Sequence, residues 1–309
     1  MAYTRYLNSV KELEESINKD WDQALVHLSE NKRKIQSDQT LYYDEHKDQK
    51  EKKSYYRSIK LTGNGKQLFN AHHELVKRKH IRQIPYFFSK DQYLYTWVDM
   101  QPDGSVKSIY SGEHKDPKIM LKEDYDTIHK KHQQFQKLLE KARKPTYQLD
   151  EKMRDIDTEL KFNTEHIIPQ SWFGAREPMK GDLHHLFVCE PNCNTARSNF
   201  PFEDFSFYNP ESPKEKIRNR CGVAVNGRFE PEDGKGISAR AVLYFLLRYP
   251  DAIRKSFLKQ LDVPLLIRWH KEFPVTIYEK HRNRAIAHIQ GNRNPFIDFS
   301  DLAEKIPFK

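Results

Sequence analysis

The sequence is poor in cysteine and has no long apolar segment. Three cysteines among 309 residues are a small, odd number, which argues against a disulfide framework and fits a reducing compartment. No stretch approaches the roughly 20 apolar residues that span a bilayer. The longest apolar run, Ala241 to Leu247, stands between two arginines and reads as a buried helix. We therefore expect no membrane partner.

The opening segment, MAYTRYLNSVKELEESINKDW, also lacks the apolar centre of a secretory signal peptide. Three expectations about location follow. The protein stays in the cytoplasm, or it is exported by a non-classical route, or a leader has been removed.

Composition and charge narrow the class of protein. Hydrophobic residues make up 37% and charged residues 31%, so the chain can bury a core under a very polar surface, and disorder throughout is excluded. A net charge of +9 and a pI near 9.2 attract polyanions. Nucleic acid is therefore the first partner to consider.

Hydrophobic spacing predicts several elements in the first half. Apolar residues at steps of three and four from Leu7 to Leu28 predict an amphipathic helix. Residues 44–53, DEHKDQKEKK, form a solvated helix face or a linker and are the best boundary candidate. A helix is expected at Leu68–Lys79. Residues 93–100 and 105–112 resemble strands joined by the turn QPDG, which together predict a β-hairpin.

The second half is expected to be helical. A long charged helix is predicted from about Glu123 to Arg143, with a second helical stretch before Phe162. Three more are predicted near 237–249, 263–272 and 275–289, followed by the Asn-rich loop QGNRNPFID. The predicted fold class is α+β, a mostly helical domain around a small mixed sheet. Residues 1–55 are assigned to an N-terminal helical extension and 56–309 to a catalytic domain, or all pack as one domain.

Polar residues that could carry chemistry gather in two segments. FNTEHIIPQSWF (162–173) places Glu165 beside His166, and GDLHHLFVCEPNCNTARSNF (181–200) supplies a second cluster. Neighbours in a strand point to opposite faces. Glu165 and His166 can share one site only if the strand ends or twists there.

These residue types meet the needs of phosphodiester hydrolysis, which are an activated water and neutralised charge on the phosphate and the leaving oxygen. A neutral His166 can accept a proton from water. Glu165 and Asn194 offer oxygen ligands that suit Mg²⁺. A single histidine among 14 is more often a surface or core residue, but a Glu-His dyad before proline, followed by DLHHL and NTARSN, is hard to explain as packing.

These segments resemble the endonuclease I family, whose site is the ββα-metal or His-Me finger also found in HNH nucleases. The likeness extends over roughly residues 60–305. The matching blocks are EHIIPQSW, GDLHHL, NTARSN, KGISARAVLY (235–244) and YEKHRNRAIAHIQGNRNPFID (278–298), with a weaker one at 93–112.

The resemblance implies a bacterial, Mg²⁺-dependent endonuclease that cuts DNA, and in several members RNA, with little sequence preference. Its products would be 5′-phosphate and 3′-hydroxyl ends. Position by position, His166 matches the general base, and Glu165 and Asn194 match the metal ligands, with Mn²⁺ or Ca²⁺ able to substitute. The finger's first strand should contain His166 or end near it, and its helix should start near Asn194, which the resemblance places at the opening of that helix.

Arginines are the candidates for phosphate contact. Arg197, Arg240 and Asn292 fall in matching motifs and are either phosphate-binding or part of a buried polar network. The insertion that many relatives carry after the Glu-His strand is nearly absent, and an arginine and a glutamate with supporting roles go with it. DLHHL also places His185 where asparagine is usual. Arg176, Arg197 or Arg240 would then stabilise the phosphate.

The three cysteines leave three alternatives open. Cys189, Cys193 and Cys221 could join His184, His185 or an acid around a structural Zn²⁺, which needs four ligands. They could instead be free buried thiols, or two of them could form a disulfide.

Two other classes of function compete with the nuclease. One is a non-catalytic nucleic-acid-binding protein on a decayed nuclease scaffold, although Glu165, His166 and Asn194 are all present. The other is a partner-binding protein that uses the long charged helices, which would leave the polar clusters unexplained. An active nuclease in the cytoplasm would also need a protein inhibitor.

Overall fold

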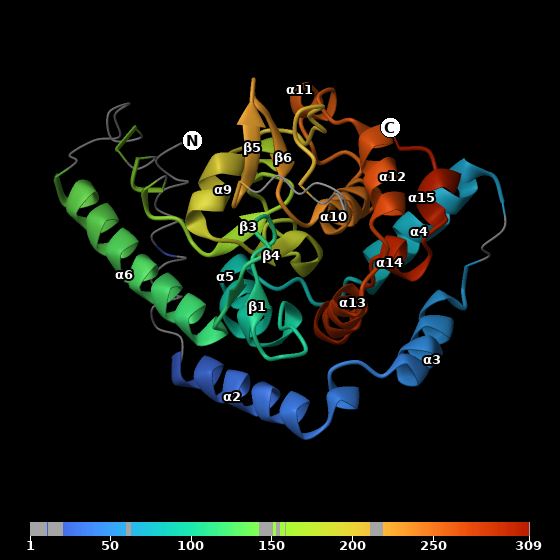
Figure 1. The fold of residues 1–309 in the computed structure, drawn as a ribbon, viewed down its shortest axis with the longest axis horizontal. Helices are drawn as coiled ribbons and strands as arrows, with labels where there is room; N and C mark the ends of the chain where they lie inside the picture. The colour runs from blue at the N-terminus through green and yellow to red at the C-terminus, as the bar shows by residue number, and fades with distance from the viewer. Residues whose placement is uncertain are drawn as a thin grey trace.

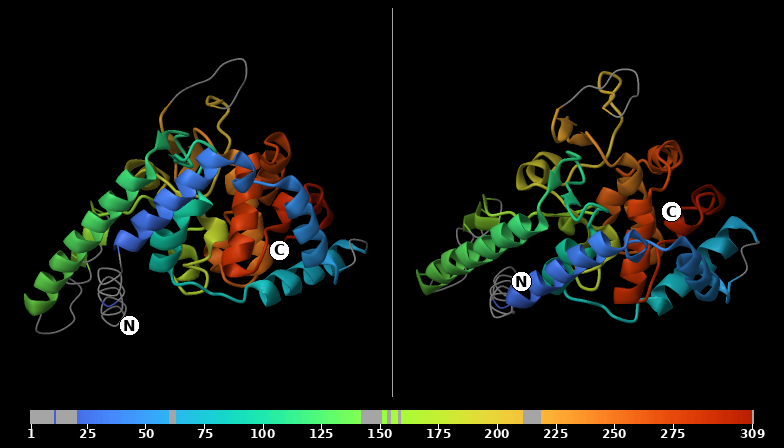
Figure 2. Two further views of the ribbon diagram at one scale, coloured as in Figure 1. Left: turned by 90° about the horizontal axis from the view of Figure 1, so that it is seen from below. Right: turned by 60° about the horizontal axis from the view of Figure 1, so that its bottom comes forward.

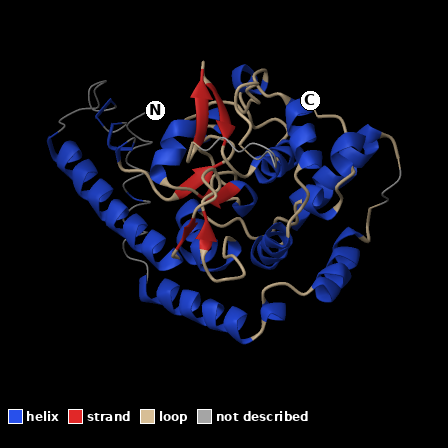
Figure 3. Ribbon diagram, in the orientation of Figure 1, coloured by secondary structure: helices blue, strands red, loops and turns tan. Residues whose placement is uncertain are grey.

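The computed structural model describes residues 11, 21–59, 63–141, 151–152, 155–157, 159–210 and 219–308. Within these ranges the chain forms a mainly helical α+β fold with three small sheets (Figures 1 and 3). The α-helices are α2 (Trp21–Ser37), α3 (Glu45–Tyr56), α4 (Gly65–Lys79), α5 (Tyr86–Phe88), α6 (Pro117–Lys141), α8 (Gln170–Phe173), α9 (Pro191–Arg197), α10 (Lys235–Arg248), α11 (Lys255–Leu258), α12 (Val263–Glu272), α13 (Ile277–Gln290), α14 (Pro295–Asp298) and α15 (Leu302–Lys305).

The remaining elements are short. Two 3₁₀ turns, η1 (Gln39–Leu41) and η3 (Leu183–His185), and one π-helix, η2 (Ser89–Val98), complete the helical part. The strands are β1 (Val106–Lys107), β2 (His114–Lys115), β3 (Thr164–His166), β4 (Leu186–Val188), β5 (Gly222–Val225) and β6 (Arg228–Pro231).

The prediction of a small mixed sheet is wrong. The described strands pair only as β1 with β2, β3 with β4 and β5 with β6, and each pair is antiparallel. Strands of two to four residues are too short to recruit further neighbours, and helices pack against them instead, η2 on β4 and α9 on β3 and β5.

The buried helix predicted from the longest apolar run is confirmed as α10, which lies at the centre of one hydrophobic core. It packs against α12, α4 and the turn η3 (Figure 1). Gly234 caps its N-terminus with a φ of +79°. A Cβ there would lie 2.5 Å from the carbonyl oxygen of Ile109, so the approach of α10 to the β1–β2 hairpin requires glycine.

The strand predicted at residues 93–100 is wrong, because most of this segment forms the π-helix η2. Aromatic and β-branched residues favour strands, but burial decides the outcome. Leu94, Tyr95 and Val98 are all completely buried, and their spacing places them on one side of a helix. The segment fills a second core between α2, α6, α13 and β4. The QPDG turn is retained, because Met100 bridges Val106 in antiparallel fashion.

The N-terminal predictions are partly confirmed. The first amphipathic helix is present as α2, and its expected first half lies largely outside the described residues. The segment from Asp44 to Lys53 is a helix face, not a linker. It forms most of α3, which turns Asp48 inward to Arg293 at 2.8 Å. The division of the chain at residue 55 stays a prediction.

Helices α4, α12 and α13 lie close to their predicted bounds, whereas α6 begins at Pro117, well before the predicted start near Glu123. Residues 151–152, 155–157 and 159 are helical, as expected before Phe162. Figure 2 shows α6 as a long helix along one side of the molecule, beside α2. The Asn-rich loop includes the short helix α14, which Asn294 caps by accepting a hydrogen bond from the backbone of Phe296.

Across the described residues, no helix combines the length and apolar character needed to cross a membrane.

Candidate active site

The candidate residues lie on the succession β3, β4 and α9. Thr164, Glu165 and His166 of β3 pair with Val188, Phe187 and Leu186 of β4. Helix α9 begins three residues after β4 ends and packs against β3. As predicted, the first strand contains His166. Two antiparallel strands followed by a helix give the order ββα.

His166 is held as a neutral base. Its Nε2 lies 2.9 Å from the carbonyl oxygen of Lys180. Because a carbonyl only accepts, Nε2 carries the hydrogen and Nδ1 keeps the lone pair. The amide of Gln170 donates to that Nδ1 at 3.4 Å. Burial, together with the neighbouring ring of His185, lowers the pKa of His166 well below its usual value. The imidazole is therefore uncharged and its orientation is fixed, as a proton acceptor requires.

Glu165 has different partners from its neighbour, as strand geometry predicts. Tyr110 donates to its Oε1 at 2.9 Å, and Arg197 Nε lies 3.3 Å from the same oxygen. Burial raises the pKa of Glu165 to about 7, against the opposing effect of Arg197 and the hydrogen bond from Tyr110. Both contacts are to Oε1, so Oε2 is the atom through which this side chain could reach a cation.

Asn194 is joined to the same strand. Its Nδ2 donates to the carbonyl oxygen of Thr164 at 2.8 Å, which fixes the orientation of the amide. The helix starts near Asn194, as predicted, but Asn194 does not open it. The helix begins at Pro191, because proline is well suited to the first turn of a helix. Asn194 is therefore in the middle of the helix.

The available donors fit a hard divalent cation that keeps most of its water. Among the described residues, no group of three or more His, Cys, Asp and Glu side chains could hold a metal ion. Glu165 and Asn194 would supply two oxygens, a carboxylate and an amide. Such a pair suits Mg²⁺, which usually retains several waters, and it does not suit Zn²⁺.

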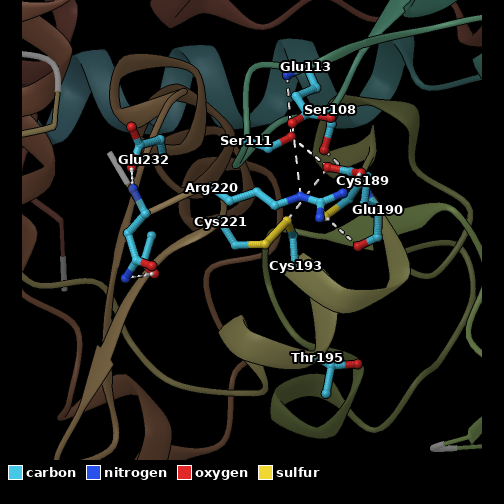
Figure 4. The surroundings of a disulfide bond; sticks show 12 residues. Ser108, Ser111, Glu113, Cys189, Glu190, Cys193, Thr195, Arg220, Cys221 and Glu232 are labelled. Atoms are coloured by element: carbon cyan, nitrogen blue, oxygen red, sulfur yellow. Dashed lines mark hydrogen bonds and ion pairs between the residues drawn. A yellow bond between two sulfur atoms is a disulfide. The ribbon is translucent and has the colours of Figure 1, made fainter. Parts of the chain in front are cut away.

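Of the three alternatives for the cysteines, structural zinc is wrong, and the other two each hold in part. Cys193 and Cys221 form a disulfide, and Cys189 is a buried free thiol. The bond joins α9 to the residue that directly precedes β5 (Figure 4). Cys193 is the neighbour of Asn194 in the chain. Beside it, Glu190 accepts hydrogen bonds from Ser111 at 2.8 Å and Arg220 at 3.2 Å (Figure 4). These contacts fix the start of α9. The expectation of a reducing compartment rested on the low cysteine count, and the disulfide removes that support.

A buried network of hydrogen bonds also supports β3. Asp124 of α6 accepts hydrogen bonds from Lys90 at 2.8 Å, Tyr95 at 2.6 Å and the backbone of Asn163 at 2.8 Å. The hydroxyl of Tyr95 also contacts that of Thr164 at 2.5 Å. The carbonyl of Thr164 thus accepts from Asn194. Its hydroxyl donates to Tyr95, because the single phenolic hydrogen of Tyr95 is given to Asp124. The π-helix η2, which carries Lys90 and Tyr95, contributes directly to the support of the site.

Of the four candidate phosphate-binding residues, three are buried and one is exposed. Arg197 is 1% exposed and donates to the carbonyl of Ile167 at 2.8 Å. Arg240 is 2% exposed and binds both oxygens of Glu279. Asn292 is completely buried. Arg176 alone among these four is exposed, with its Nε donating to the carbonyl oxygen of Phe173.

His185, where the family usually has asparagine, and its neighbour Asp182 serve the core around the site. His185 Nε2 donates to the carbonyl of Met179, and its ring lies 5.5 Å from that of His166. Tyr244 and Tyr249 donate to Asp182 at 2.7 and 2.9 Å. Although burial opposes it, the nearby histidines hold the pKa of Asp182 below its usual value.

Several residues that contact the site were not predicted from the sequence. Gln170 stands in the block EHIIPQSW, four residues after His166, and this spacing is a signal that could have identified it. Tyr110 and Tyr95 lie in segments read as strands, and nothing in the sequence pointed to Glu165 or Thr164 as their partners. A polar cleft of ≈ 470 Å³ lies elsewhere, lined by α3, α12 and α14 residues such as Asp48, His270 and Asp298.

Known proteins are similar in sequence to this part of the chain. A sequence model of the family described as endonuclease I matches residues 64–301. An extracellular ribonuclease of Bacillus amyloliquefaciens is 32% identical over 162 residues, which cover 47% of this chain and 53% of that protein. An extracellular deoxyribonuclease of Aeromonas hydrophila is 31% identical over 157 residues, which cover 43% of this chain and 64% of that protein.

A third relative is named endonuclease-1, from Buchnera aphidicola subsp. Baizongia pistaciae. It is 30% identical over 125 residues, which cover 39% of this chain and 47% of that protein. The chain thus spans between about half and two thirds of the length of the first curated relatives it matches.

Proposed function

The chain belongs to the endonuclease I family, and on that premise we propose that it is a metal-dependent nuclease. It would hydrolyse phosphodiester bonds of DNA, and of RNA, with little sequence preference. The observation that carries the proposal is the geometry of His166. Its Nε2–H is fixed on the carbonyl of Lys180, and its Nδ1 keeps a lone pair for a proton.

In the proposed reaction, Nδ1 of His166 accepts a proton from a water molecule as the water oxygen attacks phosphorus. The bond to the 3′-oxygen breaks, leaving 5′-phosphate and 3′-hydroxyl ends. The amide of Gln170 holds the Nδ1 edge at 3.4 Å before substrate enters, and it would have to turn aside or share this atom with the water. The low pKa of His166 keeps the base unprotonated between turnovers.

Glu165 and Asn194 would hold a divalent cation, with Mg²⁺ the first candidate and Mn²⁺ or Ca²⁺ as substitutes. When bound, this ion supplies positive charge to the phosphate oxygens and to the leaving 3′-oxygen. Tyr110 and Arg197 orient Glu165 through its Oε1. The bond from Asn194 to Thr164 turns the amide oxygen of Asn194 away from the strand.

We infer the compartment in which the protein acts from its disulfide. A bond between Cys193 and Cys221 persists in oxidising surroundings and is rare where thiols are kept reduced. Relatives of this chain are named extracellular or periplasmic. We therefore propose that the protein acts outside the reducing cytoplasm, where it also would not need an inhibitor.

Digestion assays with purified protein test the nuclease proposal. Plasmid DNA and a structured RNA are incubated with protein in Mg²⁺, in Ca²⁺ and in excess EDTA. Cleavage in Mg²⁺ that EDTA abolishes, with 5′-phosphate ends on the products, is the expected result. Binding of DNA without any cleavage, in every metal tried, would instead favour the non-catalytic binding protein.

Metal binding is tested separately from activity. Titration calorimetry with Mn²⁺ should give one site in the wild type, weakened at least tenfold in Glu165→Gln and in Asn194→Ala. Glu304→Gln, which changes an exposed carboxylate that pairs with Lys271, is the matched control. Equal Mn²⁺ affinity in all four proteins would mean that these two ligands are misassigned.

A further inference from the structure

One exposed aromatic pair stands out on the surface. The rings of Phe205 and Phe207 stack with centroids 5.3 Å apart and planes at 16°. Phe207 is 60% exposed. Single exposed apolar side chains are common on protein surfaces, whereas here a half-buried ring, Phe205, supports the exposed ring of Phe207.

The backbone on both sides of Phe207 is fixed. The amide of Phe205 donates to buried Glu230, and the hydroxyl of buried Tyr208 donates to Glu232. A further bond at 2.9 Å joins the amide of Tyr208 to the carbonyl of Phe205. The ring of Phe207 is therefore presented by an anchored turn. Little ordering entropy would oppose its contact with a ligand.

This turn is connected to the candidate active site through α9, which it follows along the chain. Phe202, five residues before Phe207, packs its ring 5.2 Å from the guanidinium of Arg197, which contacts Glu165. Five residues of chain span at most about 18 Å.

Local charge permits an anionic ligand here. Asp204, beside the pair, is already satisfied by Lys235 at 3.0 Å and Trp269 at 2.8 Å. Arg268, whose side chain is 55% exposed, lies 3.7 Å from the same carboxylate. The whole chain carries +9. An acidic protein surface would be attracted too, but a nucleic acid combines negative charge with a flat aromatic face in every nucleotide.

We propose that Phe205 and Phe207 form a stacking platform for unpaired bases, so that single-stranded nucleic acid is a preferred substrate of this enzyme. This inference rests on the proposed nuclease function and names its substrate class. A ring face can meet a base face only where the base is not already covered by its duplex neighbours. Stacking is indifferent to base identity, which agrees with weak sequence preference.

The test measures binding of fluorescein-labelled 15-mers by anisotropy, in EDTA so that no strand is cut. The probes are oligothymidylate, an oligomer of the same length made only of abasic sites, and a duplex of the same length. Stacking of one base on an aromatic ring contributes about 1–3 kcal/mol, equivalent to roughly 5- to 150-fold in affinity. Phe207→Ala should weaken oligothymidylate binding within that range and leave the abasic and duplex probes within about twofold.

Three further variants separate stacking from other effects. Phe207→Tyr keeps the aromatic face and should bind oligothymidylate like the wild type. Phe207→Leu keeps an apolar side chain but no ring and should behave like Phe207→Ala, whereas a general apolar contact would survive it. Ile277→Ala, 59% exposed on α13, is the matched control and should change nothing.

The outcomes distinguish this inference from the nuclease proposal. Unchanged oligothymidylate binding in Phe207→Ala, or an equal loss on the abasic probe, overturns the platform and leaves the nuclease intact. If the wild type binds none of the three probes and cuts no plasmid in Mg²⁺, both proposals fall. The expected pattern in activity is slower cleavage of single strands by Phe207→Ala, with plasmid nicking unchanged.

Discussion

The Nε2 atom of His166 lies 2.9 Å from the carbonyl oxygen of Lys180. Lys180 belongs to the segment that joins β3 to η3, so the chain after the strand folds back to orient its last side chain. Because the acceptor is a backbone carbonyl, substitution of the Lys180 side chain would not remove it. The orientation of the His166 ring therefore does not depend on that side chain. It leaves Nδ1 as the atom that can take a proton.

Substitution of the exposed arginine should affect substrate binding alone. Arg176→Ala removes a cation that the structure leaves accessible. We expect a several-fold higher KM for DNA and a shallower dependence on salt, with an unchanged urea midpoint. Arg33→Ala, an exposed position on α2, is the control. If both variants change KM equally, Arg176 has no specific role.

Substitution of the buried arginine should instead destabilise the fold. Arg197→Ala leaves Glu165 buried without its ion-pair partner. Removing one member of a buried pair costs about 3–5 kcal/mol, which urea unfolding would detect. A variant that stays as stable as the wild type but fails to bind DNA would contradict this assignment and make Arg197 a phosphate ligand.

The network behind β3 predicts a ranked pair of effects on the free energy of unfolding. Asp124→Asn should cost roughly 3 kcal/mol, because buried Lys90 loses one of its two carboxylate partners and keeps only Asp91. Tyr95→Phe, which removes only hydrogen bonds, should cost about 1–2 kcal/mol. Adding Lys90→Met to Asp124→Asn should recover part of the loss. No recovery in the double variant would show that the pair is not coupled.

The disulfide gives a prediction with an internal control. Cys193 and Cys221 close a loop with a sequence separation of 28, and chain-entropy arguments give roughly 3–4 kcal/mol for a loop of this length. Reducing agent should lower the stability of the wild type and of Cys189→Ala to a similar extent. The Cys193→Ser/Cys221→Ser double variant should start low and ignore the reductant. Equal stability of all proteins in both conditions would contradict the bond.

Buried histidines predict the response to acid. Burial lowers the pKa of His184 to about 4 from its ordinary value near 6.5. A pKa depressed in the folded state gives stability that is complete above pH 6.5 and is lost as the pH falls toward 4. The difference corresponds to roughly 3 kcal/mol. Urea midpoints between pH 7.5 and 4 should therefore fall, and less so in His184→Asn.

His46, which is exposed, supplies the control for that experiment. His46→Ala should follow the wild-type profile throughout. A stability that stays flat down to pH 4 in the wild type would mean that the buried histidines do not control acid unfolding.

Local sequence signals predicted the parts of the fold and site that depend on local rules. The apolar run before Arg248 became α10, the prolines marked the ends of α12 and α13, and the Glu-His dyad ended a strand. Each of these follows from side-chain periodicity or backbone restriction within a few residues.

The rest required tertiary contacts. Tyr95 has strand-forming neighbours, yet burial on one side of η2 makes its segment helical. An odd cysteine count hid the bond between Cys193 and Cys221, because sequence does not show which thiols approach. Arg240 stands in a matching motif, but only the fold reveals that Glu279 already binds it. Motif membership predicted importance and could not separate substrate contact from internal support.

Cleavage by His166→Ala tests the central claim most directly. The rate of plasmid nicking is measured at saturating Mg²⁺, with urea unfolding to show that the variant folds and Mn²⁺ calorimetry to show that it still binds metal. Loss of a positioned general base should slow the reaction roughly 10²- to 10⁴-fold without changing metal affinity. A folded, metal-binding His166→Ala protein that nicks plasmid within twofold of the wild-type rate would contradict the assignment of His166 as the general base.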